Sequence, residues 1–268
     1  MKRNILLTIA YDGRDFHGWQ RQPGKRTVQG ELEKTLSYVI GQQVTIDGTS
    51  RTDAGVHALG QRASLRGDFG IPANRIPFAV NNILDDIYIV DAEEVQNDFH
   101  ARFDSVGKTY EYKINISDTP DLFQRAYEYQ LTRARRHLLV TEQDGTNDFE
   151  RGFQRMKKAC GYLIGTYDCA CFMAQGSFVP ESTVKTIYDV TVTKIADDLT
   201  IVVTGSGFLY NMVRIIVGTL VDIGTGRIEP EDIAAMIASR DRTRAGHTAP
   251  PQGLYLKKIY YKIEDIIK

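Results

Sequence analysis

One ten-residue segment, Gly48–His57, concentrates residue types that can perform nucleophilic chemistry. It places a carboxylate, Asp53, two positions after the guanidinium of Arg51, and it follows a predicted strand. A neighbouring positive charge keeps a carboxylate ionised, as a nucleophile requires. A turn in which Asp53 caps the next element and Gly55 adopts a positive φ would have the same composition. The segment therefore predicts either a nucleophilic aspartate or a structural turn.

Arg214 is the one charged residue in the apolar segment Phe208–Val221, which has the pattern of a buried helix. We expect Arg214 to be buried there. A desolvated guanidinium is costly unless an anion accepts its hydrogen bonds, and Asp53 is the best-placed candidate for that anion. In the alternative interpretation, Arg214 lies at the helix edge and extends to water.

Aromatic residues give two further candidate contacts. Tyr110 lies on a predicted strand, where it is either a core aromatic or a residue that stacks on a base and exchanges a proton. The loop 15–26 alternates aromatic residues such as Trp19 with cations such as Arg21, as single-stranded RNA readers do. A solvated connecting loop would show the same mixture.

Composition and motifs exclude several function classes. The chain has 33 Lys and Arg against 34 Asp and Glu with 42% hydrophobic residues, which is typical of a folded globular protein. It lacks the glycine-rich phosphate loops, the His-Glu-x-x-His metal motif and the Gly-x-Ser-x-Gly elbow. We therefore expect neither a cofactor nor a bound metal.

The charge is unevenly distributed along the chain. Residues 1–66 hold ten Lys and Arg against six Asp and Glu, and residues 240–262 hold six against one. Such segregation can form a basic surface for a polyanion, although solvated charges that point in different directions would give the same counts.

The cysteines and the N-terminal residues bear on location. Three clustered cysteines, Cys160, Cys169 and Cys171, cannot form a disulfide framework and have no histidines nearby to complete a zinc site. The apolar stretch 5–10 is too short for a signal peptide or a membrane span. We expect a cytoplasmic protein without membrane contact.

Hydrophobic spacing predicts an α+β fold in two parts, 1–105 and 106–268. Strands are expected at 4–11, 43–49, 61–66 and 86–95, with a helix from Val28 to Ile40 that stops at Gly41. The second part has the following expected elements: strand 107–114, helix 149–163, a hairpin of 184–195 and 199–204, helix 209–223, a helix from about 229, and strand 254–261. The Arg-rich stretch 131–147 is expected to be an exposed insertion. Strands and helices do not alternate strictly, which favours a mainly antiparallel sheet with helices on one side.

Several motifs together resemble the tRNA pseudouridine synthase A (TruA) family over almost the whole chain. They are Tyr11-Asp12-Gly13, Phe16-His17-Gly18-Trp19-Gln20-Arg21-Gln22, Thr27-Val28-Gln29-Gly30, Arg51-Thr52-Asp53-Ala54-Gly55-Val56-His57-Ala58, Phe99-His100-Ala101-Arg102-Phe103, Lys108-Thr109-Tyr110, Phe208-Leu209-Tyr210-Asn211-Met212-Val213-Arg214 and Gly253-Leu254-Tyr255-Leu256.

The resemblance implies roles for individual residues. Asp53 would be the catalytic nucleophile, Tyr110 would lie against the target uracil, and Arg214 would pair with Asp53. Arg51 would lie at the same cleft, facing RNA phosphate or the flipped nucleotide. Three more substrate-binding residues are expected from the same motifs: Arg21, Trp19 and His57.

The resemblance also implies a reaction, a fold and partners. The reaction would be isomerisation of uridine to pseudouridine in the tRNA anticodon stem-loop, at positions 38, 39 and 40, without a cofactor. The fold would be two similar ferredoxin-like halves that form a central cleft, in a homodimer. Two alternatives remain from the residues: a glycoside hydrolase, which usually needs a second carboxylate, and a non-catalytic RNA-binding module.

The chain departs from the family pattern in two places. It reads Tyr167-Asp168-Cys169-Ala170-Cys171-Phe172 where many members have His-Asp-Phe, and its 131–147 segment is longer than expected. Both lie away from Asp53 in the sequence, so they bear on tRNA docking or dimer contacts more than on the chemistry.

Overall fold

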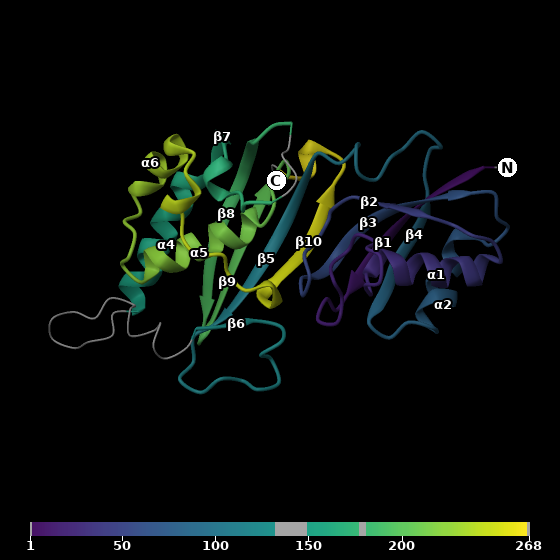
Figure 1. Ribbon diagram of the computed structural model, residues 1–268, viewed down its shortest axis with the longest axis horizontal. Helices are drawn as coiled ribbons and strands as arrows, with labels where there is room; N and C mark the ends of the chain where they lie inside the picture. Colours follow the sequence, from purple (N-terminus) through teal and green to yellow (C-terminus); the bar gives the residue numbers. More distant parts are fainter. Residues whose placement is uncertain (1, 132–148, 177–180, 267–268) are drawn as a thin grey trace. The chain divides into compact units, whose positions relative to one another are not determined.

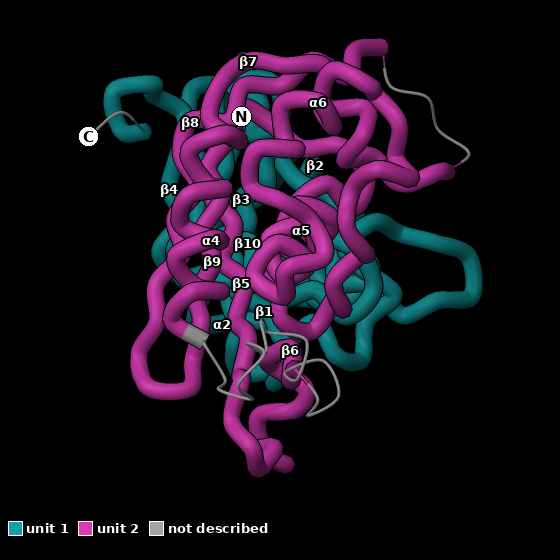
Figure 2. The backbone as a smooth tube through the Cα atoms, turned by 90° about the vertical axis from the view of Figure 1, so that its left-hand side faces the viewer, with its two compact units in different colours: residues 1–108, 255–266, 268 teal, residues 109–254, 267 magenta. Residues whose placement is uncertain are grey.

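The computed structural model describes residues 2–131, 149–176 and 181–266, which form two compact units (Figure 1, Figure 2). Unit 1 comprises residues 1–108 and 255–266, and unit 2 comprises residues 109–254. The expected insertion at 131–147 lies outside the described residues, apart from Leu131.

Unit 1 is a sheet with two helices. Its elements are β1 (Arg3–Tyr11), α1 (Val28–Ile40), β2 (Ile46–Gly48), β3 (His57–Gly67), α2 (Ile76–Asn81), β4 (Ile87–Glu94) and β10 (Leu254–Tyr260). The strand order is β4-β1-β3-β10, with β2 on β3. β1 pairs antiparallel with β3 and β4, whereas β10 runs parallel to β3. α1 and α2 contact each other and lie beside the strands of this sheet (Figure 1).

The expected helix at 28–40 is confirmed, and its ends have clear causes. The Thr27 hydroxyl accepts a hydrogen bond from the Gly30 N–H at 3.3 Å, which caps the first turn. Leu32 and Leu36 are fully buried on the sheet side. Gly41 adopts φ 77°, a left-handed conformation that ends a helix at low cost when the residue is glycine.

In the described residues, unit 2 combines strands with three α-helices. Its elements are β5 (Gly107–Asn115), β6 (Tyr129–Gln130), α4 (Phe149–Leu163), β7 (Gly165–Asp168), β8 (Val184–Ile195), β9 (Asp198–Gly205), α5 (Met212–Gly224) and α6 (Asp232–Ser239). The strand order is β5-β9-β8-β7, with β6 parallel to β5. Antiparallel pairing of β8 with β9 confirms the expected hairpin. α4 packs against α5, α6 and β8.

The two units differ from the expected division in one respect. The first boundary falls at 108/109, close to the expected 105/106, but β10 from Tyr255 onward belongs to unit 1. The reason is its parallel pairing with β3, in which Tyr255 lies opposite His57 and Leu256 opposite Ala58. The strand predicted at 254–261 is present, whereas its partner was not predicted. The α+β expectation is confirmed by both units.

Candidate active site

Asp53 lies in the loop that joins β2 to β3. The Val56 N–H donates to the Asp53 carbonyl at 3.2 Å, and Gly55 has φ 78°, so residues 53–56 form a tight turn. Thr52 is buried, Asp53 is half-buried and Arg51 is exposed. The hydrogen bond that closes this turn is made by backbone atoms, so a structural turn and a reactive aspartate side chain are compatible in one loop.

A second loop, residues 12–19, supports the Asp53 loop from one side. A Cβ on Gly18 would lie 2.5 Å from the Thr52 carbonyl oxygen, and one on Gly13 would lie 2.0 Å from the Val56 carbonyl oxygen. The Trp19 N–H donates to the Thr52 carbonyl at 3.1 Å. Side chains at positions 13 and 18 would push the two loops apart. The glycines therefore set the position of the backbone that carries Asp53.

Trp19 does not occupy the exposed position expected of a residue that stacks on RNA. Its side chain is 2% exposed and packs against Tyr11, with ring centroids 6.0 Å apart. A Cβ on Gly48 would lie 2.3 Å from the indole nitrogen, so the absence of a side chain at Gly48 makes room for the ring. This placement gives Trp19 a packing role next to the loop. The burial does not favour the expected contact of Trp19 with substrate, which stays a prediction.

His57 is also buried, with 2% of its surface exposed. Its Nδ1 accepts a hydrogen bond from the Gly13 N–H at 3.0 Å, and its ring stacks on Tyr255 at 4.8 Å. The imidazole therefore links the 12–19 loop, the start of β3 and β10. Because its surface is covered, the expected contact with substrate is not supported by this arrangement.

Arg21 keeps an exposed side chain but is anchored at one nitrogen. Its Nε lies 3.1 Å from Oε2 of the buried Glu33. The other oxygen of that carboxylate accepts hydrogen bonds from the Ile46 N–H at 2.9 Å and from Gln29 Nε2 at 3.1 Å. Glu33 thus ties the Arg21 loop to α1 and β2. Contact of Arg21 with RNA stays a prediction.

Lys108 was given no role in the sequence analysis, although it begins the Lys-Thr-Tyr motif. Its Nζ lies 3.2 Å from the Thr49 carbonyl oxygen and 3.3 Å from the Ser50 hydroxyl, in the segment that leads to Asp53. Burial, with a smaller contribution from the charge of Arg102, lowers the pKa of Lys108 from 10.5 to about 8. A partly buried ammonium whose hydrogen-bond partners are neutral oxygens lowers the free energy of unfolding. The presence of Lys108 at this position therefore favours a functional role for its side chain.

Two site candidates lie in unit 2. Tyr110, on β5, is 6% exposed and meets Phe208 edge to face, with ring centroids 5.3 Å apart.

Every residue of α5 except Arg214 is buried, and Arg214 itself is half-buried, which corrects the expectation of full burial. The Arg214 Nε donates to the Ala249 carbonyl at 2.7 Å, and Nη1 donates to Asn211 Oδ1 at 2.8 Å. The pairing of Arg214 with Asp53 stays a prediction.

The described residues contain no group of three or more His, Cys, Asp or Glu side chains arranged to bind a metal ion. All three cysteines are buried as free thiols, and burial raises the pKa of each. In the described ranges, no helix has the length and apolar character needed to cross a membrane.

Comparison with known proteins identifies the family. A sequence profile described as tRNA pseudouridine synthase matches residues 7–104 and 159–262. The chain belongs to the tRNA pseudouridine synthase family. The Asp53 loop, its supporting loop 12–19, Lys108, Tyr110 and Arg214 therefore lie within a chain of the isomerase class.

Individual tRNA pseudouridine synthases match over almost the whole chain. The tRNA pseudouridine synthase A of Thermoanaerobacter sp. (strain X514) is 43% identical over 260 residues, which cover 97% of this chain and 100% of the relative. That of Bacillus subtilis (strain 168) is 44% identical, over 96% and 98%. That of Ruminiclostridium cellulolyticum is 45% identical, over 97% and 100%.

The free-energy cost of burying the Lys108 ammonium leads to a prediction for this tRNA pseudouridine synthase. Lys108→Met should stabilise the protein by about 1 kcal/mol at pH 7, because a shift from 10.5 to about 8 corresponds to about 3 kcal/mol and the lost hydrogen bonds offset part of it. Turnover should fall, since Thr49 and Ser50 lose a tether. Urea unfolding and pseudouridine formation measure the two effects.

The stability difference should depend on pH with a definite sign. Below pH 8 both the folded and the unfolded states hold the Lys108 proton, so the burial cost is fully present. Between about pH 8 and 10.5 the unfolded state binds more protons, so the wild type gains stability and the advantage of Lys108→Met shrinks. Lys34→Met, at an exposed position on α1, is the control and should change stability by less than about 0.5 kcal/mol. A Lys108→Met enzyme with wild-type turnover would show that the ammonium has no functional role.

Proposed function

We propose that this enzyme converts uridine to pseudouridine in the anticodon stem-loop of tRNA, at positions 38, 39 and 40, with Asp53 as the nucleophile and without a cofactor. Family membership supports the reaction, and the motif resemblance supports the positions. The observation that best supports the role of Asp53 is its place in a backbone turn. The 12–19 loop packs closely against this turn at Gly13 and Gly18.

The reaction needs no external energy or redox partner. The bond between N1 of uracil and C1′ of the ribose breaks, the uracil turns, and C5 bonds to C1′. C5 loses a proton to solvent, and N1 gains one, so atoms and electrons balance. An ionised Asp53 either attacks C1′ directly or stabilises the electron-poor sugar while a glycal forms, and Tyr110 holds the detached base and assists the proton transfer.

Two arginines complete the proposed site. Arg214 neutralises the Asp53 carboxylate, and Arg51 faces RNA phosphate or the everted nucleotide. Fixed geometry at Arg214 supports its role, because Ala249 and Asn211 accept hydrogen bonds from two of its nitrogens and so set the plane of the guanidinium. The exposure of Arg51 suits contact with a phosphate.

The partner is tRNA, bound in this proposal by a homodimer in the cytoplasm. Uridine must leave its stack to reach Asp53, which costs a few kcal/mol. Contacts of Lys and Arg with phosphates can offset that cost, and they make binding weaken as salt rises.

Tritium release tests the proposal directly. Unmodified tRNA carrying tritium at C5 of uridine is incubated with the enzyme and EDTA, and release is compared with that from tRNA in which positions 38, 39 and 40 are cytidine. We expect release only from the first tRNA, with RNA mass conserved. Equal release from both tRNAs would reject the positions, and dependence on a metal would reject the absence of a cofactor. Free uracil with an abasic site would indicate hydrolysis.

A further inference from the structure

The segment Ala245–Pro250, here called the strap, runs beside α5 and is bound to it at several points. The Gly246 N–H donates to the Thr219 hydroxyl at 2.9 Å, and the Ala249 N–H donates to the Arg214 carbonyl at 3.0 Å. Arg214 Nε returns a hydrogen bond to the Ala249 carbonyl at 2.7 Å. The strap therefore helps to orient the Arg214 guanidinium, together with Asn211.

Glycines allow the strap to lie directly on the helix backbone. A Cβ on Gly218 would lie 1.7 Å from the His247 carbonyl oxygen, and one on Gly246 would lie 2.5 Å from the Thr219 Cα. Such a close approach leaves little space for the strap to slide. A change in its register would move the Ala249 carbonyl and release the Arg214 side chain.

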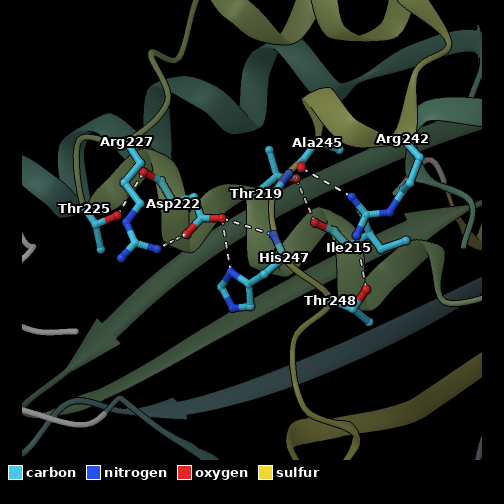
Figure 3. Close-up of polar contacts among 10 residues, drawn as sticks. Ile215, Thr219, Asp222, Thr225, Arg227, Arg242, Ala245, His247 and Thr248 are labelled. Carbon is cyan, nitrogen blue, oxygen red and sulfur yellow. Dashed lines mark hydrogen bonds and ion pairs between the residues drawn. The ribbon is translucent and has the colours of Figure 1, made fainter. Parts of the chain in front are cut away.

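A buried carboxylate ties the middle of the strap to the helix. Asp222 Oδ2 accepts hydrogen bonds from both the backbone N–H and Nδ1 of His247, each at 3.1 Å (Figure 3). The other oxygen lies 3.5 Å from Arg227 Nη1. His247 also faces the ring of Tyr129, with centroids 6.2 Å apart. Burial alone would raise the pKa of Asp222, but the His247 hydrogen bonds and the charges of His247 and Arg227 outweigh burial and lower it.

We propose that His247 and Asp222 are positioning residues for Arg214: their paired hydrogen bonds hold the strap in the register that lets the Ala249 carbonyl orient the guanidinium. This inference rests on the proposed role of Arg214 in catalysis. Asp222 is a buried carboxylate in the mainly apolar helix α5, and such a charge is costly unless it serves a specific contact. Its carboxylate makes 3.1 Å hydrogen bonds with His247 of the strap, two residues before Ala249.

The test compares three variants by tritium release from total unmodified tRNA, so it does not depend on which uridine reacts. His247→Leu should lower kcat about 10- to 100-fold with KM within twofold, because small displacements of a catalytic group cost rate. His247→Asn, whose amide can donate where Nδ1 does, should recover most of kcat. Arg227→Gln, the control, removes the other partner of Asp222 without touching the strap and should behave as wild type.

Hydrogen exchange shows whether the strap loosens, and the Arg214→Lys variant tests the role of Arg214 on which this inference rests. The Gly246 and Ala249 amides should exchange faster in His247→Leu than in His247→Asn, while the urea midpoints report global stability. Wild-type kcat in His247→Leu, or no recovery in His247→Asn, would overturn the inference. If Arg214→Lys retains wild-type kcat, the proposed role of Arg214 fails and this inference fails with it. If Arg214→Lys loses kcat while His247→Leu keeps the wild-type kcat, this inference is rejected and the proposed role of Arg214 stands.

Discussion

Asp53→Asn is expected to bind tRNA as the wild type does and to lose at least about 10³-fold in turnover. Asparagine has the shape of aspartate, and the hydrogen bond that closes the turn uses the Asp53 carbonyl rather than its side chain. The variant therefore keeps this backbone hydrogen bond while it loses the negative charge. Binding depends on phosphate contacts made elsewhere, so Kd should change by less than about threefold. Single-turnover tritium release and filter binding measure the two quantities.

Asp47→Asn is the matched control for this experiment. Asp47 lies on β2, six positions before Asp53 in the printed sequence, and its exposed carboxylate is 3.6 Å from Arg66. Its loss should leave turnover and binding unchanged, because exposed ion pairs contribute little. Turnover of Asp53→Asn within tenfold of the wild type would reject the nucleophile. Loss of tRNA binding in Asp53→Asn would instead assign the side chain a structural role.

Gly18→Ala should damage unit 1 through both backbone strain and steric overlap. Gly18 has φ 84°, a conformation that alanine adopts only with strain, and its new Cβ would lie 2.5 Å from the Thr52 carbonyl oxygen. Strain and overpacking together should lower the free energy of unfolding by about 3–5 kcal/mol. Because the Thr52 backbone must move, turnover should also fall at temperatures where the variant is folded. Urea unfolding and tritium release provide the readouts.

Gly24→Ala separates these two causes. Gly24 also has a positive φ, of 68°, but no atom lies within 4 Å of its Cβ position. It should lose only about 1–2 kcal/mol through backbone strain and retain full turnover. If Gly18→Ala matched Gly24→Ala in both stability and turnover, the 12–19 loop would have no part in placing Asp53.

Regular elements with a long periodic pattern were predictable from the sequence. Leu32 and Leu36 recur at helical spacing before Gly41, and the helix ends where that glycine predicts. The short helix α2 was missed, because six residues with a proline in the first turn give little periodicity. β7, with four residues, was missed for the same reason. The pairing of β10 with β3 depends on contacts between distant segments, which no local pattern encodes.

The site was predictable in its chemistry but less so in its environment. Asp53 stood out because a carboxylate, a guanidinium and two glycines share a short segment. The burial of Trp19 was missed because the ring fits against Gly48, which is far from Trp19 in the sequence. Lys108 was missed for a similar reason, since its contacts are with Thr49 and Ser50, which lie far from it in the sequence. Arg214 was expected to be buried because its neighbours in the helix are apolar, and that pattern does not show how far one charged side chain reaches the surface.

The parallel pairing of β10 with β3 bears on how the enzyme is made. The strand that begins at His57, directly after the Asp53 loop, gains its β10 neighbour at Tyr255 and Leu256. During translation the ribosome releases this neighbour after all the other strands. A nascent chain that has emerged only through β9 therefore lacks the partner of His57 and Ala58, next to the Asp53 loop. Pseudouridine synthesis should thus begin only after translation has passed β10, and premature stop codons upstream of Tyr255 should yield chains without activity.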